Sequence, residues 1–211
     1  MLKQADWSHT TSRCAVVPLP LDVASLSKSL RRQHVQRERR VAAAGHFVSF
    51  RRTRTTRELL DSHAMLETLY AARWAASTPV ASAAATYAAW TEVLRRLGNE
   101  AAFIASAEIN GTPIALQLCL YRGDRCYSVR PAMHPDMLHL SPGHLLLRRL
   151  IENLAADGFR ALDLGRTVES TGQIGYKGQY GPSWGETVTS VIDGPVEQQR
   201  RVQQRTKQFS R

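Results

Sequence analysis

Residues 101–133 constrain the fold of this chain more than any other segment, because apolar and polar side chains alternate along them and tight turns interrupt the alternation. A period of two is typical of β-strands. Asn110-Gly111 supplies the two positive-φ residues of a type I′ turn. The return strand is expected over 114–120, and a second turn at 122–125 leads into a third strand over 126–133. The pattern predicts a three-stranded antiparallel meander.

Helical periodicity precedes the meander, and a helix with two short strands follows it. A serine before a proline at Ser141-Pro142 is typical of a helix start, and Gly45 is a suitable residue just beyond a helix end. A glycine-rich loop is expected over 165–184 and a frayed helix over 197–211. The remaining expected elements are a helix from Ser25 or Ser27 to Ala44, a strand over 46–51, helices over 59–74, 86–97 and 142–157, and strands over 159–164 and 187–192.

This order of elements indicates an α/β fold with one mixed, mainly antiparallel sheet flanked by helices. We expect residues 1–24 to be an extended N-terminal remnant, with only a short extended piece around 16–21. Residues 25–193 would form the folded domain, and residues 194–211 a polar basic tail. The length of 211 residues is sufficient to bury a substantial core.

The positive charge of the chain is concentrated in one block. The formal net charge is +10, and residues 28–57 carry ten basic side chains against the single acid Glu38, so nearly all of the excess lies in thirty residues. Such a block favours an anionic partner. A solvated helix face is the simpler interpretation, and the sequence leaves both open.

Other features narrow the class of protein. No run of apolar residues is long enough to cross a membrane, and the first residues lack the apolar core of a signal peptide. Three cysteines do not make a disulfide framework, so we expect a cytoplasmic protein. Cys119 and Cys126 fall on neighbouring strands and are expected in the core. No metal-ligand spacing or Ser/His/Asp set is legible, and we expect no metal.

Two segments are candidate sites on physical grounds. The helix start at Ser141–His144 would present backbone N–H groups and the positive end of a helix dipole to an anion. The loop over 165–184 follows a buried strand, and long ordered loops at strand ends commonly serve binding. Arg166 and Lys177 give this loop two cations. Neither segment contains a nucleotide-binding glycine fingerprint.

The same residues resemble a known family. Leu162-Asp163-Leu164-Gly165-Arg166-Thr167, Thr171-Gly172, Tyr176-Lys177 and Tyr180-Gly181 are similar, with matching spacing, to the "DfGRS…TG…FK..wG" stretch of FemAB-like acyltransferases of the GNAT superfamily. These include exopolysaccharide-associated and CelD-type members. Leu140 to Leu146 resembles their "lsPGrlLl" helix start, and Leu26 to Gly45 resembles their "RR…R…G" basic helix. The resemblance covers roughly residues 26–192.

The resemblance implies an acyltransferase that moves an acetyl or aminoacyl group to an amine of a cell-envelope or polysaccharide-related acceptor. The donor would be acetyl-CoA or another acyl-CoA, with aminoacyl-tRNA as the alternative. Members carry a further N-terminal GNAT-like half, here expected to be absent or reduced to residues 1–24, so a separate half-domain or a second copy is an expected partner. The pyrophosphate motif R/Q-x-x-G-x-G/A is missing, and Ser141-Pro142-Gly143 takes its place.

Carried onto this sequence, the motifs suggest catalytic and donor-binding residues. Lys177 is the first candidate, as a cation for donor phosphate or oxyanion, and we expect its replacement by alanine to abolish transfer with little change in melting temperature. Arg166 is the second, and Glu108 occupies the conventional place of a general base, although alternation suggests that it faces solvent. Asp163 is expected to pair with a cation such as Arg166. The donor-binding candidates are Tyr176, Gly178, Tyr180, Gly181, Thr171, Gly172, Ser141, Gly143, His144, Arg31 and Arg32.

Two alternatives remain open at this point. The basic block is compatible with a non-catalytic module that binds a polyanion or nucleic acid, which would show a steep salt dependence. The chain could equally be the inactive half of a two-domain FemAB-like protein.

Overall fold

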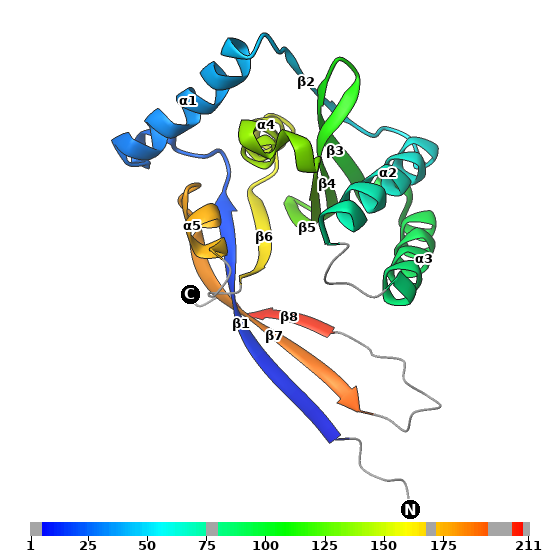
Figure 1. Ribbon diagram of the computed structural model, residues 1–211. Helices are drawn as coiled ribbons and strands as arrows, with labels where there is room; N and C mark the ends of the chain where they lie inside the picture. Colours follow the sequence, from blue (N-terminus) through cyan, green and yellow to red (C-terminus); the bar gives the residue numbers. More distant parts are fainter. Residues whose placement is uncertain (1–5, 75–79, 168–171, 194–203, 209–211) are drawn as a thin grey trace, which may run out of the picture. The chain divides into compact units, whose positions relative to one another are not determined.

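A computed structural model describes residues 6–74, 80–167, 172–193 and 204–208, and they form two compact units (Figure 1). The larger unit spans residues 18–162, and the smaller combines residues 1–17 with 163–211. The elements in chain order are β1 (Asp6–Pro18), η1 (Val23–Ser25), α1 (Lys28–Ala43), β2 (Val48–Arg52), α2 (Thr56–Trp74), α3 (Val80–Leu97), η2 (Gly98–Glu100), β3 (Ala102–Ile109), β4 (Thr112–Arg122), β5 (Arg125–Met133), η3 (Pro135–Leu140), α4 (Pro142–Ala156), β6 (Ala161–Thr167), α5 (Gln173–Gly178), β7 (Ser183–Asp193) and β8 (Gln204–Gln208).

The predicted meander is confirmed as the centre of the larger unit. Strands β2, β3, β4 and β5 lie side by side in that order, and each pair is antiparallel. Asn110 and Gly111 have φ angles of 52° and 77°, as the turn between β3 and β4 requires. Cys119 and Cys126 are both fully buried, as expected. Strand β2 occupies the edge of this sheet.

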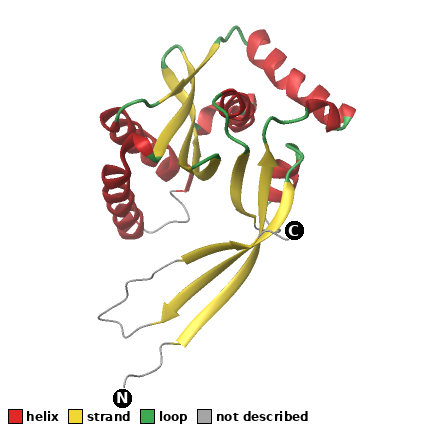
Figure 2. Cartoon of the chain, turned by 180° about the vertical axis from the view of Figure 1, so that it is seen from behind, coloured by secondary structure: helices red, strands yellow, loops and turns green. Residues whose placement is uncertain are grey.

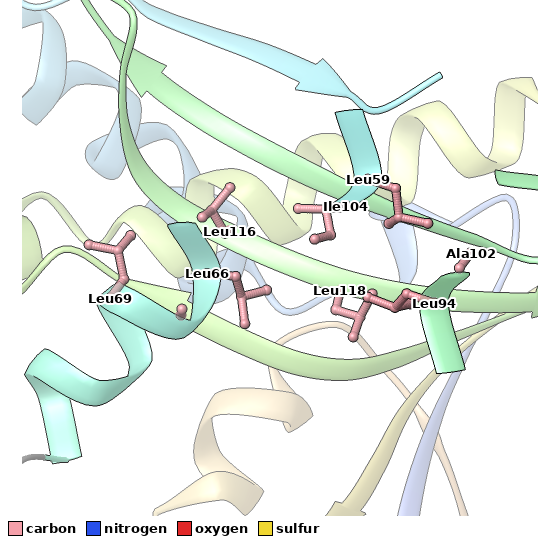
Figure 3. Close-up of a cluster of buried hydrophobic side chains, with 9 residues drawn as sticks. Leu59, Leu66, Leu69, Leu94, Ala102, Ile104, Leu116 and Leu118 are labelled. Carbon is pink, nitrogen blue, oxygen red and sulfur yellow. The ribbon is translucent and has the colours of Figure 1, made fainter. Parts of the chain in front are cut away.

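One face of the sheet packs against α2 and α3 (Figure 3). Alternate residues of β3 and β4 point to this side, where leucines of the two helices meet them. Because these side chains are almost completely removed from water, each contributes roughly 1.5–3 kcal/mol to stability. The cluster consists of Leu59, Leu66, Leu69, Leu94, Ala102, Ile104, Leu116, Leu118 and Ala132.

A buried ion pair joins α2 to β5 beside this cluster. The Arg130 guanidinium lies 2.7 Å from Glu67 Oε1 through Nε and donates to Oε2 through Nη2 at 2.9 Å. The two side chains are only 16% and 12% exposed. Arg130 also stacks 3.7 Å from the centre of the Tyr70 ring. The buried ion pair, with its hydrogen bond from Nη2 to Oε2, joins α2 to β5.

Helix α4 covers the opposite face of the sheet, as the two views in Figure 1 and Figure 2 show. It buries a leucine-rich stripe that includes Leu146, Leu150 and Leu154. Helix α1 contacts α4 and η3. Its Ser27 side chain caps the first turn by accepting from Leu30 N–H, and its main buried residues are His34 and Val41. This thin stripe agrees with the sparse apolar pattern of the helix.

The smaller unit holds the strands β6, β1, β7 and β8 in that order. Strand β1 pairs with β7 along its length, from Asp6↔Asp193 to Val16↔Ser183, although only a short extended piece was expected there. The expected helix in the tail is wrong over 204–208, which form β8 against β7; the remainder of 197–211 lies outside the described residues. The loop expected over 165–184 contains the short helix α5.

The chain thus has the expected mixed α/β fold, with a mainly antiparallel sheet flanked by helices. Among the helices of the described residues, none combines the length and the apolar character that a membrane span requires.

Candidate functional site

The end of β6 is shaped by Asp163 and Gly165. Asp163 is buried, and its Oδ1 accepts hydrogen bonds from Gly165 N–H at 2.8 Å and from the Cys14 thiol on β1 at 3.0 Å. Gly165 has a φ of 71°, a conformation that favours glycine. The carboxylate therefore stabilises a local bend in the strand. The pairing of Asp163 with Arg166 that the sequence suggested is not the contact that the structure shows.

Lys177 on α5 binds this bend from the other side. Its ammonium donates to Gly165 O at 3.1 Å, to Arg166 O at 2.7 Å and to Thr167 Oγ1 at 3.2 Å, and the residue is only 7% exposed. An ammonium has three N–H donors, so these three oxygens match its donors in number. Because the side chain joins α5 to β6, these contacts lead us to predict a lower melting temperature after its replacement, in place of the unchanged value expected from the sequence.

The neighbouring motif residues lie around Lys177. Arg166 is exposed at the end of β6, and Tyr176 is half-buried on α5. Tyr180 is buried, and the rings of Tyr176 and Tyr180 meet edge to face at 6.3 Å. The other donor-binding candidates in this segment are Gly178, inside the last turn of α5, and Gly172 and Gly181, both exposed at positive φ, whereas Thr171 lies outside the described residues.

The start of α4 differs from the expected cap. Ser141 adopts a left-handed conformation, with a φ of 56°, and its side chain makes no cap hydrogen bond. The N–H groups of His144 and Leu145 both donate to Ser141 O, and Pro142 has no N–H. Gly143 lies between Pro142 and His144 in this first turn. The turn does not present a row of backbone donors to a diphosphate.

Side chains beside this turn supply positive charge instead. A pocket of about 200 Å³ between α1 and α4 is lined by His34, Arg37, His46, His144, Arg148 and Arg149, with Glu38 and Glu152 as its acids. Glu38 pairs with Arg148 at 3.2 Å, and Glu152 pairs with Arg148 and Arg149. Burial, assisted by the charges of Arg37 and His34, lowers the pKa of His144 to about 4. His144 is therefore neutral at pH 7 in a cationic setting, which suits an anionic ligand.

A second, larger pocket of about 510 Å³ lies between β2 and α4. Leu146, Leu150 and Ala105 supply an apolar part of its lining, and four arginines add positive charge: Arg51, Arg52, Arg54 and Arg149. Phe50 and Arg149 line both pockets, so the two adjoin.

Five predicted residues of the larger unit line neither pocket: Ser141 and Gly143 at the start of α4, and Glu108, Arg31 and Arg32. Glu108 is buried at 8% exposure, not solvent-facing, and its Oε1 accepts from Ser106 Oγ at 2.7 Å. Arg31 donates to the carbonyls of Ala24 and Leu26, which stabilises the chain before α1, and Arg32 is exposed.

The pocket-lining residues His34 and Arg37 were not selected from the sequence. The helical stripe that begins at Leu30 and ends at Val41 passes through positions 34 and 37, so the period of 3.6 identifies them as the residues of α1 that face α4. The resemblance to the "RR…R…G" helix had directed attention to Arg31 and Arg32 instead.

The meander is thus followed along the chain by α4, by β6 with its bend at Gly165 and by the short helix α5. The sequence matches the family described as acetyltransferase (GNAT) domain over residues 28–178. Since this is most of its length, the chain belongs to that family. Comparison with curated proteins gives no match.

Solved structures share the fold at low sequence identity. FemX has a TM-score of 0.60 and 12% identity, over 82% of this chain and 60% of its own. The L-PGS of Bacillus licheniformis has a TM-score of 0.55 and 14% identity, over 87% and 62%. A C-terminal domain from Agrobacterium fabrum, assigned to a lysylphosphatidylglycerol synthetase, has a TM-score of 0.59 and 14% identity, over 89% and 62%. This chain therefore spans less than two thirds of these relatives.

Proposed function

We propose that this chain transfers an acyl group to an amine. The observation that carries the proposal is the family match, which extends through the bend of β6 and reaches Lys177 on α5. In this reaction the amine nitrogen forms a bond to the acyl carbon, and the bond from that carbon to the donor's sulfur or oxygen breaks. The leaving thiol or hydroxyl takes up the proton that the amine loses.

In this chain, cationic side chains are better placed than backbone N–H groups to bind an anionic donor. We propose that Arg166 contacts the donor or the developing oxyanion, because its cation is exposed beside the buried Lys177. Lys177 holds the turn from which Arg166 projects, and it would reach an oxyanion by exchanging one of its three acceptors. Glu108 stays our candidate for the general base, with its Oε1 already oriented by Ser106.

Two donors are compatible with this proposal. Acyl-CoA is the usual donor of the family, and aminoacyl-tRNA is the alternative that the resemblance to FemAB-like acyltransferases implies. We propose an amine of a cell-envelope or polysaccharide-related molecule as acceptor.

The test is a transfer assay in which each donor, acetyl-CoA or aminoacyl-tRNA, is incubated with amino sugars and lysyl compounds and products are measured by mass spectrometry. We expect product with one donor, and kcat/KM about tenfold lower for Arg166→Gln. Arg160→Gln is the matched control, because the Arg160 side chain is 84% exposed and its ion pair with Asp124 is long, at 3.7 Å. Absence of product with both donors would contradict the proposal.

A second candidate rests on the length of the relatives. Because the chain covers 60–62% of FemX and the synthetase domains, it could act only together with another chain. Activity that appears only when the neighbouring gene product is added would support this reading.

A further inference from the structure

We propose that the two adjoining pockets between α1, β2 and α4 form one groove that binds a single-stranded nucleic acid. We call it the β2–α4 groove and define it by Phe47, Phe50, Arg51, Arg52, Arg54 and Arg149. The inference does not rest on acyl transfer, since all of these residues belong to the larger unit and none is a catalytic candidate.

The first observation is unneutralised charge. Within the described parts of the chain, neither Arg51 nor Arg54 forms an ion pair, and both are exposed at the larger pocket. Arg52 differs, because it pairs with Asp157. Neighbouring arginines without acidic partners are a favourable setting for a bound anion. A guanidinium group is planar and can donate two parallel hydrogen bonds to a phosphate. The groove therefore presents arginines that are available for phosphodiester oxygens.

The second observation is an exposed aromatic surface beside these arginines. Phe47 is 81% exposed, the highest value among the exposed large apolar side chains of the described residues, and it lines the smaller pocket. Arg149 lies over the Phe50 ring, with its guanidinium carbon 5.2 Å from the ring centre. Nucleobases stack on aromatic rings and on arginine planes, and each stacked base contributes about 1–3 kcal/mol. The exposed Phe47 and the half-buried Phe50 thus precede Arg51, Arg52 and Arg54 within one short segment of chain.

The third observation is the linear shape of the site. Residues 47–54 run along and just beyond the edge strand β2, and at about 3.3 Å per residue they extend for roughly 20 Å. Such a length accommodates several nucleotides of an extended strand. A compact anion such as free phosphate would use only one part of this surface. An acidic polysaccharide would satisfy the arginines but has no planar base to stack on Phe47, and the heparin comparison below separates the two ligands.

The experiment measures fluorescence anisotropy of a labelled single-stranded RNA with the full chain at increasing salt. Arg51→Gln/Arg54→Gln is compared with Arg39→Gln/Arg57→Gln, which removes the same charge from exposed residues that line neither pocket. We expect the first pair to weaken binding at least tenfold and to reduce the salt slope by about 1.4, at about 0.7 for each lost phosphate contact. The control pair should change both quantities much less.

Phe47→Ala tests the stacking component, because it leaves the charge unchanged. We expect it to weaken binding about tenfold at every salt concentration without changing the slope. Equal losses in the two arginine pairs, or tighter binding of heparin than of RNA, would overturn the proposal. Circular dichroism of each variant verifies folding, and these exposed side chains should leave it unaltered.

Discussion

Lys177 allows a structural role to be separated from a catalytic one. We consider Lys177→Met, which keeps the length of the side chain and removes the ammonium. The change deletes three hydrogen bonds and leaves the carbonyls of Gly165 and Arg166 without this donor in a buried setting. Each such carbonyl costs about 1–3 kcal/mol, and the relief of a buried charge offsets part of this, so we expect a net loss of about 3 kcal/mol.

For a chain of 211 residues this loss corresponds to a melting temperature lower by roughly 6–12 °C. Differential scanning calorimetry measures it directly. Thr167→Val provides the matched control, since it removes only one of the three acceptors and should cost about 1 kcal/mol. In the double variant the two losses should not add, because both remove the same hydrogen bond. A melting temperature of Lys177→Met within about one degree of the unmodified chain would refute the structural role of the ammonium.

Three further predictions concern the larger unit. Leu118→Ala removes a fully buried side chain from the main cluster, so unfolding by urea should show a loss of about 3 kcal/mol. His144 has a pKa of about 4 in the folded chain, below its unfolded value, so between about pH 4 and 6.5 the unfolded chain binds a proton that the folded chain does not. The free energy of unfolding should therefore be highest above this window and fall by about 1–2 kcal/mol on acidification through it, a figure that allows for solvent screening. His144→Asn should abolish this pH dependence. Glu67→Met leaves the Arg130 guanidinium without its carboxylate and should cost about 3 kcal/mol, whereas replacing both residues by methionine should cost less; an equal or larger loss in the double variant would contradict this reasoning.

The part of the fold that the sequence predicted is the part governed by local signals. The meander has period-two alternation and an Asn110-Gly111 turn, and both signals act within a few residues. Strand β1 escaped prediction because polar residues over 8–13 give no period, and its partner β7 is far away in the sequence. Helix α5 was missed because three glycines at 172–178 mask a six-residue helix that Lys177 helps to hold in place.

In the candidate site, too, the sequence predicts some features and not others. Motif spacing selected Lys177 and Arg166 as candidates, because a family motif is a pattern in the sequence itself. It could not show that the Lys177 ammonium donates to backbone carbonyls, because nothing in a sequence indicates that the strand bends at Gly165. Similarly, alternation suggested that Glu108 faces solvent. The edge strand β2 and the bulge near Glu108 instead place its side chain in a buried position beside Ser106.

The pairing of β1 with β7 has a consequence for biosynthesis. The larger unit is continuous from residue 18 to 162, so its sheet can form on the ribosome as soon as that segment has emerged. The smaller unit pairs residue 6 with residue 193, so its sheet cannot form before residue 193 has emerged. Until then β1 has no β7 to pair with, and its exposed backbone is a site for wrong partners. Slow translation of residues 163–193 would lengthen this interval, and a chaperone that covers β1 would shorten its exposure.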